Sequence, residues 1–261
     1  MKALNEQEIL EICKLYKECG SLRGVNRVHK RSINTIKKYA SMHMNVKTQN
    51  LVKQLCTEDQ RIIGTYIGLW MGDGTQYYDK SFTVKICCNK DEITTNDFIK
   101  DIIYKLFKKK TYFSVYTKTK SAYIKLHSKF IFDFVKKYVN YNDKEKTISV
   151  HLNDNIKCYS NEFLEGCLIG LIMTDGYLKK RMVFVSISNS LAQNMADILK
   201  QFGFKPSIYI QNRKEKGWND NHYVYLTKHE SLQLTEFLDN SLKQMGYNST
   251  FKELKYGPGE I

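Results

Sequence analysis

Two aspartates, Asp73 and Asp175, are the residues of this 261-residue sequence with the clearest potential for chemistry, because each ends a copy of one repeated segment. The first copy, Gly64 to Gly74, reads GTYIGLWMGDG, and the second, Gly166 to Gly176, reads GCLIGLIMTDG. They align without a gap at an offset of 102 residues. A single Asp-Gly pair would indicate only a turn after a buried helix. The matched pair predicts two equivalent elements that bring both carboxylates together.

Two adjacent carboxylates favour a divalent cation. Without a counter-charge they repel each other, and the pKa of one of them rises. Hard divalent cations prefer oxygen ligands and would relieve that repulsion. The sequence therefore predicts a cation site shared by Asp73 and Asp175.

The repeated segments are predicted to be helices that pack against each other. Their small residues recur at a spacing of four, which places them on one face of a helix. Glycine inside a helix costs about 0.5–1 kcal/mol relative to alanine, and close approach of two backbones would offset this cost. A glycine after each aspartate is expected to end its helix in a left-handed cap. The small positions are Gly64, Gly68 and Gly72, then Gly166, Gly170 and Thr174, and the capping positions are Gly74 and Gly176.

The segments that follow each copy repeat as well, in the order α-β-β-α-β-β-α, with the number of strands uncertain by one. Each half contains an alternating strand, a helix, a Tyr-rich alternating stretch and an amphipathic helix. The fold class is therefore α+β with two pseudo-symmetric halves, and the expected domains are 1–48, a linker 49–57, 58–158 and 159–261. The strands are 82–86 and 183–187, the Tyr-rich stretches 111–126 and 207–226, and the closing helices 129–139 and 231–245.

Composition points to a polyanionic partner. The chain has 41 Lys and Arg against 27 Asp and Glu, a net charge of +14, and such an excess is typical of nucleic-acid-binding proteins. The seven cysteines include no C-x-x-C pair, which argues against a zinc site or a disulfide framework. No secretory signal and no membrane-spanning segment is apparent, so a soluble, intracellular protein is expected.

At the two motifs the sequence resembles the LAGLIDADG family. The family's nine-residue motif corresponds to YIGLWMGDG, 66–74, and LIGLIMTDG, 168–176, and the resemblance covers about residues 58–254. It implies two αββαββα halves whose strands form a saddle over double-stranded DNA. The sixth motif position, often acidic in the family, is Met71 and Met173 here, while the acids at the eighth position are intact.

The resemblance also implies a reaction. Each aspartate, with the preceding backbone carbonyl of Gly72 or Thr174, would bind Mg²⁺ and assist hydrolysis of a scissile phosphate. Both DNA strands would be cut across the minor groove of a long target, leaving short 3′ overhangs. Mn²⁺ is expected to substitute for Mg²⁺, and Ca²⁺ to bind without supporting cleavage. A single chain with both halves is expected to act as a monomer.

Further site residues follow from the same resemblance. The family places a polar residue at the end of the strand before the first inner helix, which matches Asn89 with Lys90 in one half and Asn189 in the other. A lysine near the start of each closing helix often supports the attacking water, and Lys129 and Lys228 are the candidates. In so lysine-rich a chain, each of these lysines could equally be a solvated surface residue.

The strands are expected to read DNA in the major groove with side chains that alternate off one face. Lysine-rich hairpins beside them would contact phosphates and make binding depend on salt. The expected DNA contacts are Gln76, Tyr78, Lys80, Thr83 and Lys85 in the first half, Tyr177, Lys179, Arg181, Ser186 and Ser188 in the second, and Lys118, Lys120, Arg213 and Lys214 in the flanking hairpins.

Residues 1–48 lie outside the repeat and are predicted to form a helix-turn-helix-like module. An amphipathic helix over 5–19, a short helix over 21–29 and a third over 32–40 are expected, with Ser21 as an N-cap. No acidic residue occurs from Ser21 to Lys47, which suits docking in a DNA groove. A helical cap packed on the rest of the chain is the alternative. The expected contacts are Arg31, Asn34, Thr35 and Lys38.

Two other functions remain open at this point. A splicing maturase of the same family would use the basic surface to bind intron RNA. A DNA-binding transcription regulator would combine the fold with the N-terminal module, but such a regulator is expected to lose the metal-binding acids. Both Asp73 and Asp175 are present, and the sequence therefore favours a nuclease.

Overall fold

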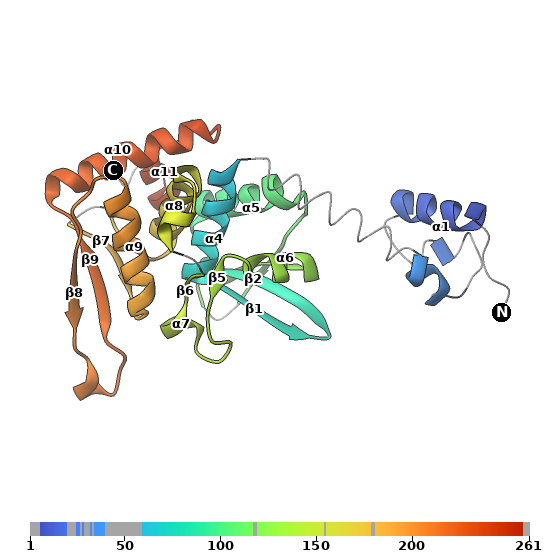
Figure 1. Cartoon of the computed structure of the whole chain (residues 1–261), viewed down its shortest axis with the longest axis horizontal. Helices are drawn as coiled ribbons and strands as arrows, with labels where there is room; N and C mark the ends of the chain where they lie inside the picture. Colours follow the sequence, from blue (N-terminus) through green and yellow to red (C-terminus); the bar gives the residue numbers. More distant parts are fainter. Residues whose placement is uncertain are drawn as a thin grey trace. The chain divides into compact units, whose positions relative to one another are not determined.

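The computed structural model describes residues 6–19, 25–26, 28, 32, 34–39, 59–116, 119–153, 155–178 and 181–257. The chain divides into two units, Met1–Glu58 and Asp59–Ile261 (Figure 1). None of the helices within the described ranges combines the length and the apolar composition that crossing a bilayer requires.

The first unit is helical in its described parts. Helix α1 spans Glu6–Cys19, and residues 25–26, 28 and 34–39 are also helical. Ile12, Val25 and Ile36 are fully buried against one another, with Leu15 and Tyr39 packed on them. A small apolar cluster therefore joins helical segments from all three predicted helices. The predicted turn at 30–31 lies outside the described residues.

The two repeated segments are helices, as predicted. Helix α4 spans Gln60–Asp73 and α8 spans Asn161–Asp175. Each begins at a side-chain N-cap: Asp59 accepts a hydrogen bond from the backbone N–H of Arg61, and Ser160 accepts one from that of Phe163. These caps satisfy backbone N–H groups that the first turn of a helix leaves without partners.

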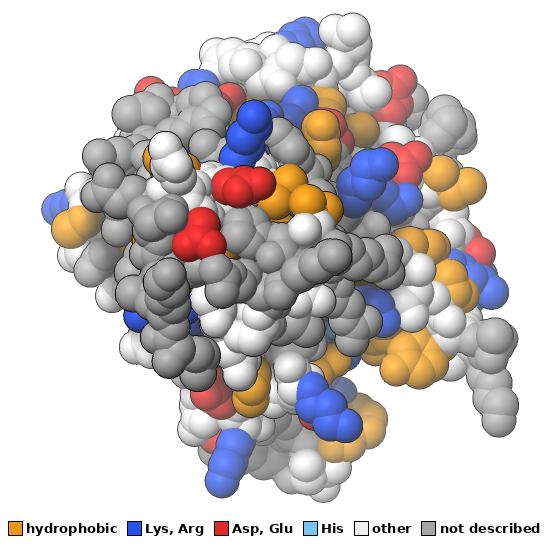
Figure 2. All heavy atoms as spheres, turned by 90° about the vertical axis from the view of Figure 1, so that its right-hand side faces the viewer, with side chains coloured by type: hydrophobic (Ala, Val, Ile, Leu, Met, Phe, Trp, Pro, Cys, Tyr) orange, Lys and Arg blue, Asp and Glu red, His pale blue; other side chains and the backbone are white. Residues whose placement is uncertain are grey.

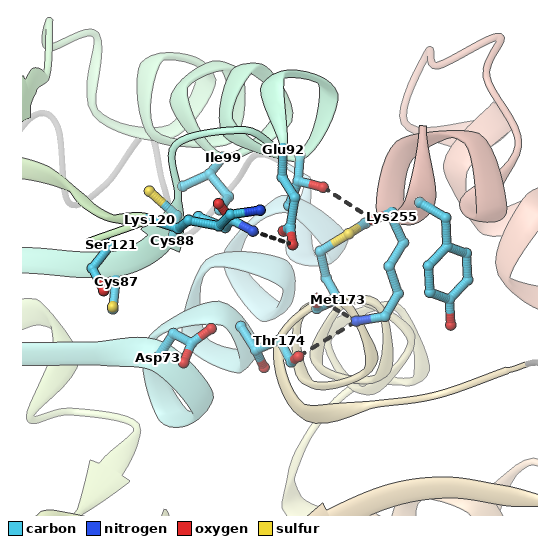
Figure 3. Close-up of a pocket in the computed structure, with 13 residues that line it drawn as sticks. Asp73, Cys87, Cys88, Glu92, Ile99, Lys120, Ser121, Met173, Thr174 and Lys255 are labelled. Carbon is cyan, nitrogen blue, oxygen red and sulfur yellow. Dashed lines mark hydrogen bonds between the residues drawn. The ribbon is translucent and has the colours of Figure 1, made fainter. Parts of the chain in front are cut away.

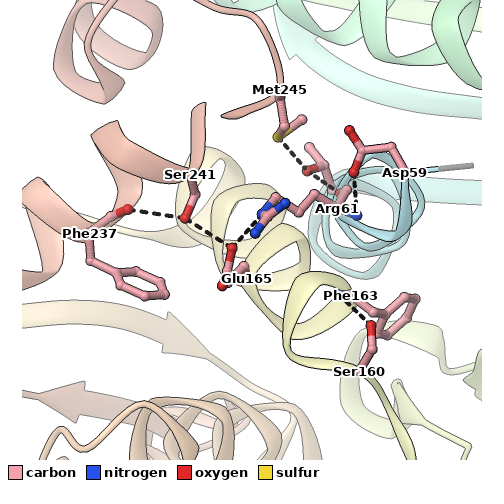
Figure 4. Close-up of polar contacts among 9 residues, drawn as sticks. Asp59, Arg61, Ser160, Phe163, Glu165, Phe237, Ser241 and Met245 are labelled. Atoms are coloured by element: carbon pink, nitrogen blue, oxygen red, sulfur yellow. Dashed lines mark hydrogen bonds and ion pairs between the residues drawn. The ribbon is translucent and has the colours of Figure 1, made fainter. Parts of the chain in front are cut away.

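Helices α4 and α8 pack with their backbones in contact. A Cβ added to any of the glycines at 64, 68, 166 or 170 would come within 3.0 Å of backbone atoms of the facing helix. Close packing of the two helix backbones therefore explains the small residues at a spacing of four, as predicted. At the end of the pair remote from the aspartates, the guanidinium of Arg61 lies 2.5 Å from the Glu165 carboxylate, which also accepts a hydrogen bond from Ser241 (Figure 4).

The glycines that follow the aspartates differ from the prediction. Gly74 has φ −78° and Gly176 has φ −91°, so both are extended rather than left-handed. A Cβ at Gly74 would collide with Trp70, and one at Gly176 would collide with Ile172. Glycine is therefore required here for close approach to the preceding helical turn, as the chain passes directly into a strand or bridge.

The first half has the expected αββαββα order. A four-stranded antiparallel sheet in the order β1-β2-β4-β3 follows α4, and a Lys146-containing helix with a two-stranded ribbon completes the half. The elements are β1 Gly74–Asp79, β2 Ser81–Asn89, α5 Ile93–Phe107, β3 Tyr112–Val115, β4 Ser121–His127, α6 Lys129–Val135, β5 Val139–Asn140, α7 Lys146–Ser149, β6 His151–Leu152 and the 3₁₀ turn η1 Ile156–Cys158. Helix α6 is shorter than the predicted 129–139, because the chain enters β5 there.

The second half repeats this plan with one strand fewer in its described residues. Its antiparallel sheet has the order β7-β9-β8. The counterpart of β1 is reduced to a single bridge between Gly176 and Phe184. The elements are β7 Met182–Ser186, α9 Asn189–Gln201, β8 Ser207–Gln211, η2 Lys214–Lys216, β9 Asn221–Tyr225, α10 Lys228–Gln244 and α11 Phe251–Tyr256.

Candidate active site at the paired helix ends

The C-terminal ends of α4 and α8 bring the two aspartates together. A Cβ added to Gly72 would touch the Thr174 side chain and lie 3.1 Å from Oδ2 of Asp175. The small residue at position 72 therefore lets one helix end approach the carboxylate of the other. This juxtaposition is the arrangement that the repeat predicted.

The surroundings of the carboxylates disfavour their charged forms. Burial and then the negative charge of Asp73 raise the pKa of Asp175, which is about 7 although Lys146 and Lys255 oppose both effects. Burial likewise raises the pKa of Asp73, against the same two lysines. The pair therefore carries the mutual repulsion expected of two carboxylates that share one site.

Lys146 and Lys255 are the functional candidates that sequence analysis missed. Nζ of Lys146 donates to the carbonyls of Trp70, Met71 and Gly72 at 3.0, 2.8 and 3.0 Å. Nζ of Lys255 donates to the carbonyls of Met173 and Thr174 at 2.6 and 3.4 Å (Figure 3). Each lysine thus satisfies carbonyls in the last turn of one motif helix, where most carbonyls lack an intrahelical N–H, although that of Trp70 also accepts the N–H of Gly74.

This position removes the ammonium groups of both lysines from water. Burial lowers the pKa of each to about 8, although both aspartates act to raise it. The lysines come from the short helices α7 and α11, in corresponding places after the last long helix of each half. Only α11 left a signal in the sequence, since Thr250 and Glu253 form the capping box that begins it.

Two hollows adjoin the aspartates, and their linings differ. The first, about 510 Å³, lies between the strand end at Cys87 to Asn89 and the end of α8, and is lined by Asp73, Glu92 and Lys255 (Figure 3). The second, about 370 Å³, adjoins Asp73 and Asp175 on the side of β7. Its strand wall includes the apolar side chains of Val185 and Ile187. The strand end beside the first hollow is therefore polar and that beside the second is apolar, although Thr147, Ser186 and Asn221 also line the second hollow.

The register of the sheets explains that difference. Gly74 pairs with Ile86, and Gly176 bridges to Phe184, so Ile86 and Phe184 are equivalent positions. Three residues further along, Asn89 in the first half corresponds to Ile187 in the second. The predicted match of Asn89 with Asn189 is therefore wrong in register: Asn189 begins α9 and is exposed.

The lysines expected at the closing helices lie elsewhere. Lys129 pairs with Asp133 at 2.6 Å on an exposed turn of α6. Lys228 lines a separate hollow with Tyr177 and Arg181. The backbone N–H of Lys90 donates to the Lys120 carbonyl at 2.8 Å, and none of these three lysines lines either hollow beside the aspartates. The two lysines that do lie beside the aspartates, Lys146 and Lys255, belong to the helices that follow, α7 and α11.

A divalent cation fits the donor set at the helix ends. Two carboxylates and the carbonyls of Gly72 and Thr174 meet there, and all of these are oxygen ligands of the kind that Mg²⁺ and Ca²⁺ take. In the described part of the chain, no group of three or more His, Cys, Asp and Glu side chains is placed to hold a metal ion. A cation at this place would therefore complete its coordination with water or phosphate oxygens.

The outer face of the first sheet carries a lysine between aromatic rings. Nζ of Lys85 lies 5.1 Å from the centroid of the Tyr77 ring and 4.5 Å from that of Tyr123. Thr83 pairs with Tyr77 and His127 and shares this face, but it is only 3% exposed and so is not available to DNA as predicted. Figure 2 shows one side of the molecule, on which basic, acidic and hydrophobic side chains are interspersed. The lysine between two tyrosine rings suits contact with a polyanion.

Strand parity corrects two of the expected DNA contacts in the first half. Gln76 pairs with Val84 and Tyr78 with Phe82, which places both on the opposite face from Thr83 and Lys85. Gln76 donates to the carbonyl of Phe132 in α6 at 3.2 Å. The remaining predicted contacts are accessible or unplaced: Lys80 forms the β1–β2 turn with φ 54°, Lys120 pairs with Asp91 at 3.4 Å, and Lys118 lies outside the described residues.

In the second half, one of the two predicted serines is structural. Ser188 is fully buried, caps α9 through the N–H of Leu191 and donates to the carbonyl of Val150 at 3.0 Å, so it is not available to DNA as predicted. Ser186 accepts a hydrogen bond from the Ser188 N–H, but it is half-buried and lines the second hollow. Arg213 stacks on Trp218 and donates to Asn221, while Lys179 and the side chain of Lys214 lie outside the described parts.

The predicted contacts of the N-terminal unit are partly described. Asn34 and Lys38 are exposed, and Nζ of Lys38 lies 5.6 Å from the centroid of the Tyr39 ring. The Thr35 hydroxyl lies 2.8 Å from that of Ser32. Arg31 lies outside the described residues. The role of this unit in DNA binding stays a prediction.

Comparison with known proteins agrees with the fold and the motifs. Residues 162–242 match the family model described as LAGLIDADG-like domain, and no curated protein matches the chain. The structure of I-DmoI in complex with DNA and Mn is similar over 69% of this chain and 97% of that one, with a TM-score of 0.52 and 14% identity. The complex of I-DmoI with DNA and Ca covers 73% and 100%, with a TM-score of 0.53 and 13% identity.

A third similar structure is the N-terminal LAGLIDADG domain of DUF199/WhiA, which covers 79% of this chain and 93% of that one at 10% identity and a TM-score of 0.48. At such identities, the likeness to solved structures concerns the fold. Residues 162–242 therefore form a LAGLIDADG-like domain, and the fold of the chain is similar to that of I-DmoI.

Proposed function

We propose that this protein is a site-specific DNA endonuclease that makes a staggered double-strand break in a long target with the help of a divalent cation. The observation that carries the proposal is the pair of carboxylates, Asp73 and Asp175, at the ends of two packed helices. A protein that used this fold only for binding would not need two acids whose charged forms burial disfavours.

The residues at the helix ends take distinct roles in the proposed reaction. Asp73 and Asp175, with the carbonyls of Gly72 and Thr174, would hold the cation, which when bound polarises a scissile phosphate and lowers the pKa of water. Lys146 and Lys255 keep positive charge beside the place where negative charge builds up on the phosphate. Asn89, in the first hollow, is positioned to orient water or a phosphate oxygen there.

DNA is the partner that the surface and the relatives favour. The net charge of +14 supplies a long-range attraction to phosphates, and half-buried Lys85 lies beside the exposed ring of Tyr77 on the outer face of the first sheet. The similar I-DmoI structures are complexes with DNA that contain Mn or Ca. We propose Mg²⁺ as the working cation, with Mn²⁺ as a substitute and Ca²⁺ as an ion that binds without cleavage.

The test is cleavage of a DNA library. The full chain is mixed with a randomised duplex library in Mg²⁺ or in EDTA, and new double-strand ends are sequenced. We expect cation-dependent ends at one long site, lost in Asp73→Asn and in Asp175→Asn. Asp97→Asn is the matched control, because Asp97 is an exposed acid paired with Lys100 on α5, and it should cut like the wild type.

A protein that cut no member of the library would favour one of the two other functions. If the protein bound duplex DNA tightly but left every library member intact, a transcription regulator would be the better reading. If it bound structured intron RNA in preference to duplex DNA, a splicing maturase would be the better interpretation. Cleavage that survived both aspartate substitutions would show that the catalytic acids lie elsewhere.

A further inference from the structure

We propose that Lys146 and Lys255 act as built-in counter-ions that keep the aspartate pair weakly attractive to divalent cations until DNA phosphates arrive. The inference rests on the proposed function, because it concerns the cation that the nuclease would use. It assigns to two lysines a role in deciding when that cation binds. Cation binding and DNA binding would then be coupled rather than independent.

The first step is the place of the ammonium groups. Lys146 contacts the carbonyl of Gly72 at 3.0 Å and Lys255 that of Thr174 at 3.4 Å. These carbonyls are the ones that a cation held by Asp73 and Asp175 would share. A metal ion bound there would therefore have a fixed positive charge within a few ångströms on each side.

The second step is the balance of charge. The two carboxylates and two ammonium groups at the helix ends oppose one another in charge. Glu92, exposed at the rim of the first hollow, accepts a hydrogen bond from Asn89 at 3.3 Å and adds a negative charge that acts on Lys255 and Asp73. A dication added to this cluster gains two attractions and meets two repulsions of similar range. In a partly buried site these interactions are several times stronger than in water. Two scissile phosphates would restore a net negative charge and favour cation binding.

The third step is the contrast with simple helix capping. A neutral donor could satisfy the same carbonyls without the cost of removing an ammonium group from water. Both halves nevertheless place a lysine there, on short helices of different sequence, KTIS in α7 and FKELKY in α11. A role for the charge itself explains why a lysine occupies the position in both halves.

The experiment separates charge from hydrogen bonding. Ca²⁺ binding to the DNA-free full chain is measured by isothermal titration calorimetry for the wild type and for the double variant Lys146→Gln with Lys255→Gln. Glutamine keeps an N–H donor for the carbonyls and removes the charge. We expect Ca²⁺ to bind the double variant at least about tenfold more tightly, because two repulsive charges are gone.

Two controls sharpen the result. Lys146→Arg with Lys255→Arg keeps both charges and should bind Ca²⁺ as weakly as the wild type. Lys105→Gln removes a lysine that also donates to a helix-end carbonyl, that of Met245 at 3.4 Å, but that does not act on either aspartate. It should leave Ca²⁺ affinity unchanged. Thermal unfolding of each variant verifies that it is folded.

Unchanged or weaker Ca²⁺ binding by the folded glutamine variant would overturn the inference and leave the lysines as helix caps. That outcome is distinct from failure of the proposed function. A wild type that cleaves DNA while the glutamine variant gains no Ca²⁺ affinity would sink the inference alone. Tight Ca²⁺ binding in the glutamine variant that survived Asp73→Asn and Asp175→Asn would show that the gained cation sits elsewhere, and would also overturn it.

Discussion

Asp175 holds its proton to a much higher pH than an aspartate in solution, and this has a consequence for stability. Its pKa is about 7 in the folded protein against 3.8 for the ordinary group. Between these values the folded state binds more protons than the unfolded chain, so stability must fall as the pH rises from about 4 to about 7. The buried lysines act in the opposite sense from about pH 8 upward, where the unfolded chain binds more protons.

We therefore expect Asp175→Asn to flatten the pH dependence of stability below pH 7. Asparagine cannot ionise, so the variant escapes the cost of charging a buried carboxyl, which amounts to a few kcal/mol near pH 7. Thermal unfolding in EDTA from pH 4 to pH 8 measures the difference, with Asp97→Asn as the exposed control. A variant whose melting temperature followed that of the wild type at every pH would contradict the raised pKa.

At the scale of the elements, the contact of α4 with α8 depends on glycines. A Cβ at position 170 would meet the backbone of Thr65, Leu69 and Gly68, none of which can move without shifting the whole helix. We expect Gly170→Ala to destabilise the protein by about 3 kcal/mol or more, as overpacking of a rigid interface does. Urea unfolding measures the loss.

Gly246→Ala is the matched comparison for that prediction. Gly246 has φ +82° and an added Cβ there meets nothing within 4 Å, so only backbone strain of about 1 kcal/mol is expected. Equal losses in the two variants would show that close helix packing is not what selects glycine in the motif.

Much of this architecture could be predicted from the sequence, because local patterns specify it. Apolar periodicity and small residues at spacing four located both motif helices, and alternation located the strands. The error at Gln76 and Tyr78 arose because β1 begins directly at Gly74, and only the observed register decides which alternate residues face outward. Lys146 and Lys255 could not be matched as a repeat, since they reach the helix ends through tertiary packing. They also follow their aspartates at unequal separations in the sequence, 73 residues for Lys146 and 80 for Lys255.

The unequal sheets lead to a prediction about the two DNA strands. At equivalent strand positions the first hollow has Asn89 and the second has Ile187, although Thr147, Ser186 and Asn221 also line the second. At that position only the first half has a polar side chain that can orient water or a phosphate oxygen. We expect the strand facing the first hollow to be cut first, so that nicked plasmid accumulates during digestion of a supercoiled plasmid carrying the target.

Ile187→Asn tests the cause of this difference. It should shorten the lifetime of the nicked intermediate by about a hundredfold, the lower end of the range for one added general acid–base group. Leu232→Asn, at an exposed position on α10, should leave it unchanged. Simultaneous cutting of both strands by the wild type would show that the residues lining the two hollows do not set the relative rates at which the two strands are cut.

At the scale of the whole molecule, the question is whether the two units share one DNA. The second unit carries the candidate active site, and the first has its own apolar core around Ile12, Val25 and Ile36. Asn34 and Lys38 are exposed on the helical segment of the first unit. A second module joined to the same chain adds contacts at a high effective concentration, so its contribution should appear in affinity rather than in the rate of hydrolysis.

We therefore expect Asn34→Ala with Lys38→Ala to weaken binding to the target duplex by about three- to tenfold, with cleavage of saturated enzyme unchanged. Because one phosphate contact is removed, the slope of log affinity against log salt should fall by about 1. Fluorescence anisotropy in Ca²⁺ at several salt concentrations measures both quantities. Lys14→Ala, on the exposed surface of α1, is the matched control. An unchanged affinity and slope would mean that the first unit packs or acts elsewhere while the second unit alone holds the DNA.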